Sequence, residues 1–67
     1  MITINQIQQF QLFCMESYKV EKKITGKRAL KDFEKKDVFN FLEIGYEVLH
    51  TQGKQYLVAE IIDFINR

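Results

Sequence analysis

The stretch that decides the fold is VFNFLEIGYEVLH, residues 38–50. In an α-helix of about 100° per residue, its apolar positions cover most of the circumference. Only Asn40, Glu43, Glu47 and His50 share a narrow polar edge. A helix with so little polar surface must be covered by several other elements, so we expect a continuous central helix over residues 38–50. Gly45 lies on its inner face, which predicts the close approach of another helix at that point.

Residues 4 to about 23 have the periodicity of an amphipathic helix that precedes the central one. Thr3 is its predicted N-cap and forms a capping box with Gln6. Gln11 falls within the apolar arc, and we expect its amide to reach water at the edge of this face; a hydrogen bond inside the protein is the alternative. Leu12 lies outside the arc, either as an isolated exposed side chain or as part of a contact surface.

Residues 26–36 form the second predicted helix, after an N-cap at Thr25. Asp37 is the predicted N-cap of the central helix, and Gly53 suits the left-handed conformation at its C-terminus. A last helix is expected over residues 54–65. No segment has the two-residue period of a strand. The sequence therefore predicts an all-α fold, a small four-helix bundle-like arrangement around a central buried helix, in a single domain of residues 1–67.

The composition is that of a small soluble protein with its own core. Hydrophobic residues make up 46% and charged residues 28% of the 67 positions, which are proportions typical of globular domains. Residues 1–15 carry no charge, but they lack the basic n-region of a signal peptide and are too polar to span a membrane. Cys14 has no second cysteine to pair with, which suits a reducing compartment. We therefore expect a cytoplasmic protein.

The charge is divided unevenly between the two halves of the chain. Residues 1–36 contain eight Lys or Arg and four Asp or Glu, a net charge of +4. Residues 37–67 contain two and five, a net charge of −3. Such a division can orient a charged partner, although ordinary solvated helix faces would produce the same pattern.

The residues needed for catalysis or metal binding are missing from the sequence. A nucleophile requires a base and an orienting group, and the only histidine, His50, and the only cysteine, Cys14, fall on different predicted helices. One histidine and one cysteine also cannot form a structural zinc site. We expect that the protein is not an enzyme and that it binds no cofactor or metal.

Binding to another protein is the function that remains. Tyrosine is an amphipathic residue that is frequent in interfaces, and Tyr56 falls away from the main apolar face of its helix. His50, Thr51 and Gln52 follow one another at the end of the central helix. The predicted protein contact consists of Tyr18, His50, Thr51, Gln52 and Tyr56. A homodimer is also compatible with so short a chain.

A small nucleic-acid-binding regulator is the alternative function. Its contacts would come from the basic residues in and before the second helix, namely Lys22, Lys23, Lys27, Arg28, Lys31 and Lys35. However, the helix in the recognition position, residues 38–50, has no Lys or Arg and carries two glutamates, which would face the phosphates. Nucleic acid is therefore an unlikely partner on charge grounds. A self-assembling structural protein is the third possibility.

Several segments resemble a family of very short bacterial proteins catalogued as a domain of unknown function. They are FCMESYK (13–19), TGK (25–27), YEVLHTQG (46–53), YLV (56–58) and IDFI (62–65), and Leu-His-Thr-x-Gly is the most characteristic part. Members are often encoded near a predicted ADP-ribosyltransferase-like toxin, so the resemblance implies an accessory or antitoxin-like role. It implies no catalytic residue. Lys54, Gln55 and Ala59 depart from the acidic residues that the family often has there.

Overall fold

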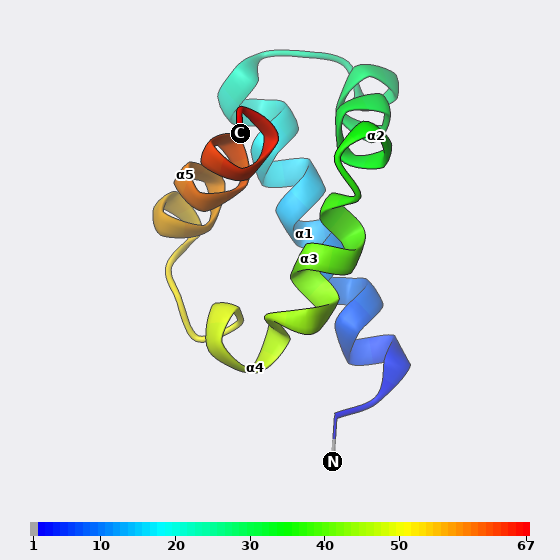
Figure 1. The fold of residues 1–67 in the computed structure, drawn as a ribbon, viewed down its shortest axis with the longest axis vertical. Coiled ribbons are helices and arrows are strands. Elements are labelled where there is room, and N and C mark those ends of the chain that lie inside the picture. The colour runs from blue at the N-terminus through cyan, green and yellow to red at the C-terminus, as the bar shows by residue number, and fades with distance from the viewer. Residues whose placement is uncertain (1) are drawn as a thin grey trace.

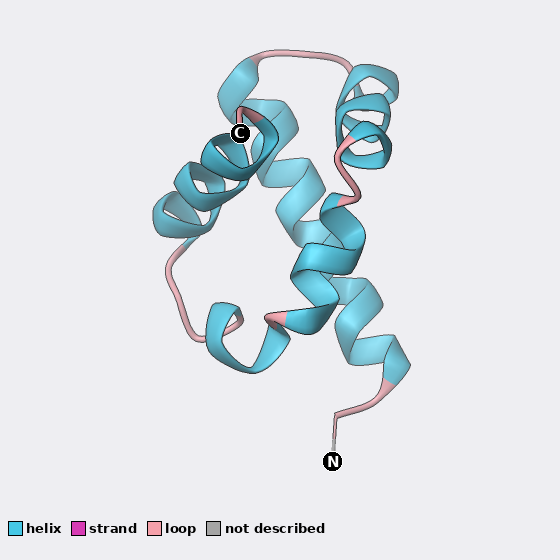
Figure 2. Ribbon diagram, viewed as in Figure 1, coloured by secondary structure: helices cyan, strands magenta, loops and turns pink. Residues whose placement is uncertain are grey.

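The structure, a computed structural model, describes residues 2–67, and this part of the chain forms five helices and no strand (Figures 1 and 2). The helices are α1 (Ile4–Lys22), α2 (Gly26–Lys35), α3 (Val38–Ile44), α4 (Tyr46–Leu49) and α5 (Lys54–Ile65). The long helix α1 packs against α2, α3 and α5, and α3 also contacts α2 and α5. The predicted all-α class is confirmed, with five helices in place of four.

The extra helix arises because the expected central helix is not continuous. Gly45, with φ −91° and ψ 8°, separates α3 from the single turn of α4, and the ribbon changes direction there (Figure 1). Val38 and Leu42 of α3 are fully buried, whereas Ile44 and Val48 project into solvent. The prediction that this stretch is covered around most of its circumference is therefore wrong.

Gly45 is also not the site of a close helix crossing. A Cβ atom at this position would lie 2.8 Å from Cδ1 and 3.3 Å from Cγ of Leu49, in the next turn of the same segment. The space around Gly45 is thus limited by Leu49, which is itself part of the core. The predicted approach of another helix is wrong.

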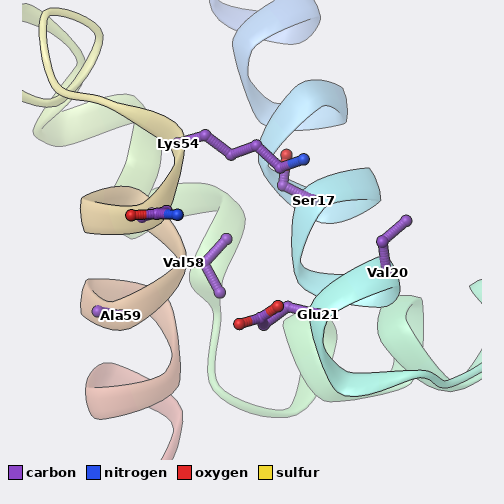
Figure 3. A pocket seen from close by; sticks show the side chains of 7 residues that line it. Ser17, Val20, Glu21, Lys54, Val58 and Ala59 are labelled. Carbon is purple, nitrogen blue, oxygen red and sulfur yellow. The ribbon is translucent and has the colours of Figure 1, made fainter.

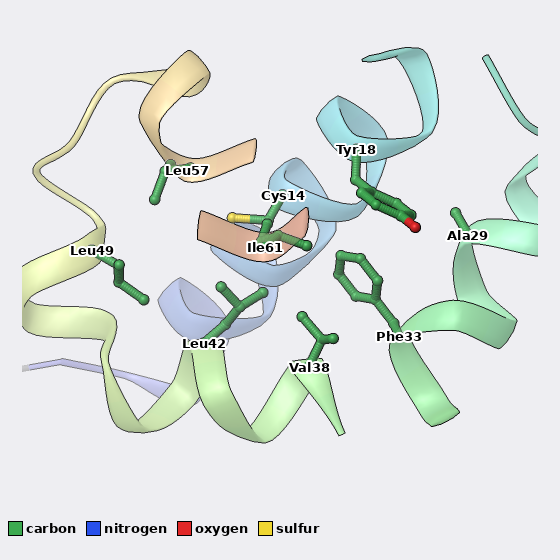
Figure 4. Packing of buried hydrophobic residues seen from close by; sticks show 9 residues of the cluster. All are labelled: Cys14, Tyr18, Ala29, Phe33, Val38, Leu42, Leu49, Leu57 and Ile61. Atoms are coloured by element: carbon green, nitrogen blue, oxygen red, sulfur yellow. The ribbon is translucent and has the colours of Figure 1, made fainter. Parts of the chain in front are cut away.

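The hydrophobic core lies where α1, α2, α3 and α5 meet (Figure 4). Phe33 stands at one end of it, with its ring 5.4 Å from that of Tyr18 and 5.3 Å from that of Phe39, measured between centroids. At the other end, Leu49 and Leu57 close the core (Figure 4). Its buried members are Cys14, Tyr18, Ala29, Phe33, Val38, Leu42, Leu49, Leu57 and Ile61.

The ends of α1 and α2 follow the sequence signals. The Thr3 hydroxyl accepts a hydrogen bond from the Gln6 backbone amide at 3.2 Å, and Gln6 Oε1 accepts one from the Thr3 backbone amide at 2.8 Å, so the predicted capping box is present. Thr25 accepts from the Arg28 amide at 3.1 Å and caps α2. Lys23 ends α1 in the left-handed conformation, with φ 56° and ψ 47°.

One local prediction holds in part and two are wrong. Asp37 is the N-cap residue of α3, as predicted, but it is in the left-handed conformation, with φ 56°, and its side chain makes no capping hydrogen bond. Gly53 is extended, with φ −72° and ψ 159°, and it serves as the N-cap of α5. The Gln11 amide does not turn to water at the edge of α1, because its Nε2 donates a 2.8 Å hydrogen bond to the Phe39 carbonyl. This bond ties α1 to α3.

Candidate protein-interaction surface

Two large apolar side chains project from α3 and α4 into solvent. Ile44 is 78% exposed and Val48 is 68% exposed. Helical hydrogen bonds continue on both sides of Gly45, from its amide to the Phe41 carbonyl at 3.1 Å and from the Leu49 amide to its carbonyl at 2.8 Å. Ile44 is the last residue of α3, and Val48 lies in the turn of α4 that follows Gly45. Large apolar side chains exposed to this degree can take part in contacts with other proteins.

An apolar cleft of about 300 Å³ adjoins Ile44, between α3 and the end of α5. The rings of Phe41 and Phe64 stack beside it, with centroids 4.2 Å apart and planes 15° from parallel. The cleft is lined by Asp37, Asn40, Phe41, Ile44, Gly45 and Phe64. Ile44 therefore stands next to a hollow that could receive an apolar side chain of a partner.

The loop that follows α4 is held in place by contacts to the carbonyl groups of that helix. His50 stacks on the Tyr46 ring, with centroids 4.5 Å apart, and its Nδ1 lies 2.7 Å from the Tyr46 carbonyl. Because a carbonyl oxygen only accepts, Nδ1 carries the proton, and Nε2 is the ring nitrogen left for other contacts. Thr51 Oγ1 donates to the Val48 carbonyl at 2.8 Å. His50, Thr51 and Gln52 are all exposed.

The two predicted contact tyrosines have different surroundings. Tyr56, on the first turn of α5, is 50% exposed, and no hydrogen bond within residues 2–67 involves its side chain. Tyr18 is only 3% exposed and belongs to the core. Tyr18 is therefore removed from the predicted contact, because a buried ring cannot meet a partner. The structure keeps the other four residues at the surface and brings His50, Thr51 and Gln52 together.

Tyr18 belongs instead to a network of side-chain hydrogen bonds between α1 and α2. Its hydroxyl donates to Asp32 Oδ2 at 2.7 Å, and Asp32 Oδ1 accepts from Arg28 Nε at 3.2 Å. Burial, followed by the hydrogen bond to Asp32, raises the pKa of Tyr18 to about 12. The hydrogen bond from Tyr18 is the main cause that lowers the pKa of Asp32 below its ordinary value, and Arg28 adds to it. These hydrogen bonds stabilise the packing of α1 on α2.

The six basic residues of the alternative site are all exposed and gather around α2. Lys27, Arg28 and Lys31 border a hollow of about 200 Å³ together with Thr25. Lys22 and Lys35 lie around a second hollow, which Arg28 also borders. Lys23 ends α1 nearby in the sequence. The structure thus produces a basic surface, although one of its members, Arg28, is paired with Asp32.

Cys14 and the possible metal ligands were compared with the requirements of a reactive thiol and of a metal site. The Cys14 thiol is fully buried, and burial raises its pKa to about 12, so it is protonated and shielded from solvent at neutral pH. Within residues 2–67, no three His, Cys, Asp or Glu side chains lie close enough together to hold a metal ion. In the same part of the chain, no helix combines the length and apolar character needed to cross a bilayer.

The chain is therefore a small all-α protein with an exposed apolar surface on α3 and α4. It belongs to the family described as "Protein of unknown function (DUF3791)", whose family model matches residues 9–67. The match begins within α1 and includes α2 to α5. No curated protein and no solved structure matches the chain.

Proposed function

We propose that the chain is a non-enzymatic protein-interaction module. Its contact is the α3–α4 surface, which we define as Ile44, Val48 and the loop residues His50, Thr51 and Gln52. The observation that supports this proposal most strongly is the exposure of Ile44 and Val48, 78% and 68%, together with the apolar cleft that Ile44 lines with Phe41 and Phe64. Full burial of an Ile or Val side chain stabilises a complex by roughly 1.5–3 kcal/mol.

The polar residues of the α3–α4 surface would orient the partner. His50 and Thr51 are already held by hydrogen bonds to α4, so little conformational freedom is lost when they meet another protein. Glu43 and Glu47 are exposed on the same two helices and carry no ion pair in the described part of the chain. A partner with basic residues around an apolar centre would complement both features.

The resemblance to short proteins encoded near ADP-ribosyltransferase-like toxins supports a more specific role. In this role the chain is an accessory or antitoxin-like protein, and the partner is the toxin-like protein itself. Binding through side chains that already stand at the surface would require no rearrangement of this domain. The chain would act by binding to its partner and would supply no catalytic group.

Affinity capture from the host tests the proposal. The tagged chain is compared with the double variant Ile44→Ser/Val48→Ser, in lysate treated with nuclease and washed at moderate salt. Leu12→Ser is the matched control, because Leu12 is 57% exposed on α1 and lies outside the proposed surface. We expect one stoichiometric protein with the wild type and with Leu12→Ser, and its loss with the double variant. Equal capture by all three would contradict the proposed surface.

Nucleic-acid binding is the second candidate, and the basic surface around α2 favours it. Lys27, Arg28 and Lys31 border one hollow, which is an arrangement that could neutralise phosphates. Against it, α3 presents no Lys or Arg, and Arg28 is paired with Asp32. Binding to random duplex that weakens steeply with salt and is lost in Lys27→Glu/Lys31→Glu would support this function over the first.

A further inference from the structure

A groove of about 350 Å³ runs between α1 and α5, on the two helices that also pack against each other in the core. Its lining comes from both helices, as Figure 3 shows. The lining residues are Ser17, Val20 and Glu21 of α1 and Lys54, Gln55, Val58 and Ala59 of α5. None of them belongs to the α3–α4 surface.

The floor of the groove is formed by two buried residues, and apolar side chains are exposed along its α1 side. Ser17 and Val58 are 6% and 5% exposed, so they form the floor, and Ala59 leaves the α5 side open. On the α1 side Val20 is 62% exposed, and Phe13, two turns earlier on the same side of the helix, is 49% exposed. Small residues between two helices allow a further helix to approach closely.

The two charged residues of the groove have opposite signs and lie at different levels along it. Figure 3 shows Lys54 near Ser17, at the start of α5, and Glu21 one turn further along α1, beside Val58. Both are exposed, and neither forms an ion pair with any residue in the range 2–67. The groove is therefore positive at one end and negative at the other.

We propose that a second copy of the chain occupies this groove, related by a two-fold axis perpendicular to it. Such an axis reverses the direction of the partner's groove, so Lys54 of each copy meets Glu21 of the other. The interface is thus complementary to itself in charge, as a two-fold contact requires. It also covers Val20 and Phe13, whose exposed rings and methyl groups would otherwise remain in water.

The size of the chain gives a physical reason for a dimer. A chain of 67 residues buries a smaller fraction of its surface than larger domains do, and folding is correspondingly marginal. Pairing α1 and α5 with the same helices of a second copy adds a four-helix contact to the small core. Stability then depends on protein concentration. This inference is independent of the proposed function, because the two surfaces share no residue.

Sedimentation equilibrium of charge variants tests the proposal. Glu21→Lys places two lysines opposite each other at both contacts, Lys54→Glu places two glutamates there, and the double variant restores both pairs. Neither change harms its own helix, because a lysine near the end of α1 and a glutamate at the start of α5 suit the helix dipoles. We expect a wild-type dimer, a dissociation constant about ten-fold or more higher in each single variant, and recovery in the double variant.

Control variants outside the groove separate the charge pairing from general effects. Glu47→Lys and Lys31→Glu make the same changes of charge outside the groove and should leave the dimer unchanged, as should Ile44→Ser/Val48→Ser. Val20→Ser should weaken the dimer without altering charge. Circular dichroism establishes that each variant is helical, and Val20→Ser and the double charge variant decide the matter if one single variant fails to fold. A monomeric wild type at millimolar concentration, or a double variant no better than the single ones, would overturn the proposal.

Discussion

At the level of single residues, Gly45 separates α3 from α4 at a position where a side chain has little room. A side chain there meets Leu49, whose Cδ1 would lie 2.8 Å from the new Cβ. Since Leu49 is 8% exposed and belongs to the core, it has little room to withdraw. We expect Gly45→Leu to lower the free energy of unfolding by about 1–3 kcal/mol, measured by urea denaturation.

Gly26 provides the matched control for Gly45. A Cβ at Gly26 would lie 3.8 Å from Cδ of Lys19, which is an ordinary contact. Gly26→Ala should therefore leave stability unchanged or raise it by about 0.4–1 kcal/mol. A Gly45→Leu variant as stable as the wild type would show that Leu49 can move away.

Tyr18 and Asp32 should make stability depend on pH at both extremes. The folded pKa of Asp32 lies below its ordinary value of 3.8, so its contribution is present above that value and is lost as the pH falls further. The folded pKa of Tyr18 is about 12, above its ordinary value of 10.0, so its contribution is present below pH 10 and is lost as the pH rises through 12.

Tyr18→Phe isolates this effect because it removes the hydroxyl and keeps the ring in the core. Near pH 6, we expect the variant to be less stable by about 0.5–1.5 kcal/mol, the value of one hydrogen bond. The difference from the wild type should shrink as the pH falls below 3.8 and as it rises above 10.0, because one partner then changes its charge. A difference that stays constant from acid to alkaline pH in denaturation curves would contradict the assigned hydrogen bond.

At the level of elements, the end of α1 is held in a conformation that favours glycine. Lys23 has φ 56° and ψ 47°, a left-handed conformation that costs an L-residue roughly 1 kcal/mol. Lys23→Gly should therefore raise the free energy of unfolding by about 1 kcal/mol and the Tm by about 4–8 °C.

Lys22 tests whether that gain depends on the left-handed conformation. It is the last residue of α1 itself, so Lys22→Gly should destabilise the protein by up to about 1 kcal/mol. Melting curves of the two variants should thus move in opposite directions. A Lys23→Gly protein that melts below the wild type would mean that the Lys23 side chain contributes more than the backbone strain costs.

The starts of α1 and α2 and the extent of α5 are the parts of the fold that the sequence predicts best. Thr3, Gln6 and Thr25 are capping residues whose signals are local, and the predicted starts of α1 and α2 agree with the structure. The last helix was expected over residues 54–65, as observed. Local hydrogen bonds depend on neighbouring residues alone, and the sequence contains them directly.

The errors occur where distant packing decides the conformation. The periodicity of residues 38–50 could not show that Gly45 interrupts the helix, because the path of the chain after Ile44 depends on how Leu49 reaches the core. For the same reason the sequence favours water for the Gln11 amide, although Phe39, 28 residues later, presents a carbonyl to it. The burial of Tyr18 likewise depends on another helix, which carries its hydrogen-bond partner Asp32.

At the level of the whole molecule, stability rests on a single small core, and the exposed apolar residues contribute little to it. Ile61 is fully buried and Ile44 is 78% exposed, so the same substitution separates the two roles. Ile61→Ala should cost about 2–5 kcal/mol, much of the total stability of a domain this small. Ile44→Ala should change the free energy of unfolding by less than about 0.5 kcal/mol in the same urea titration.

The α3–α4 surface could be predicted only in part. His50, Thr51 and Gln52 were selected because they end the helix, and they are exposed. The sequence predicts that Ile44 and Val48 are buried, since the type of an apolar residue does not show whether it lies in the core or at an interface. The signal that could have identified them is Gly45 between them, because a helix-weakening residue within an apolar run often marks a change in packing.

The measurement that tests the central claim most directly is a methyl NMR titration of the isotope-labelled chain with its captured protein partner. The account predicts that the methyl signals of Ile44 and Val48 shift or broaden on binding, while that of Leu12, which is also exposed, stays in place. The amides of residues 50–52 should respond with them. Changes confined to α2 and the end of α1, with Ile44 and Val48 unaffected, would contradict a protein interaction through the α3–α4 surface.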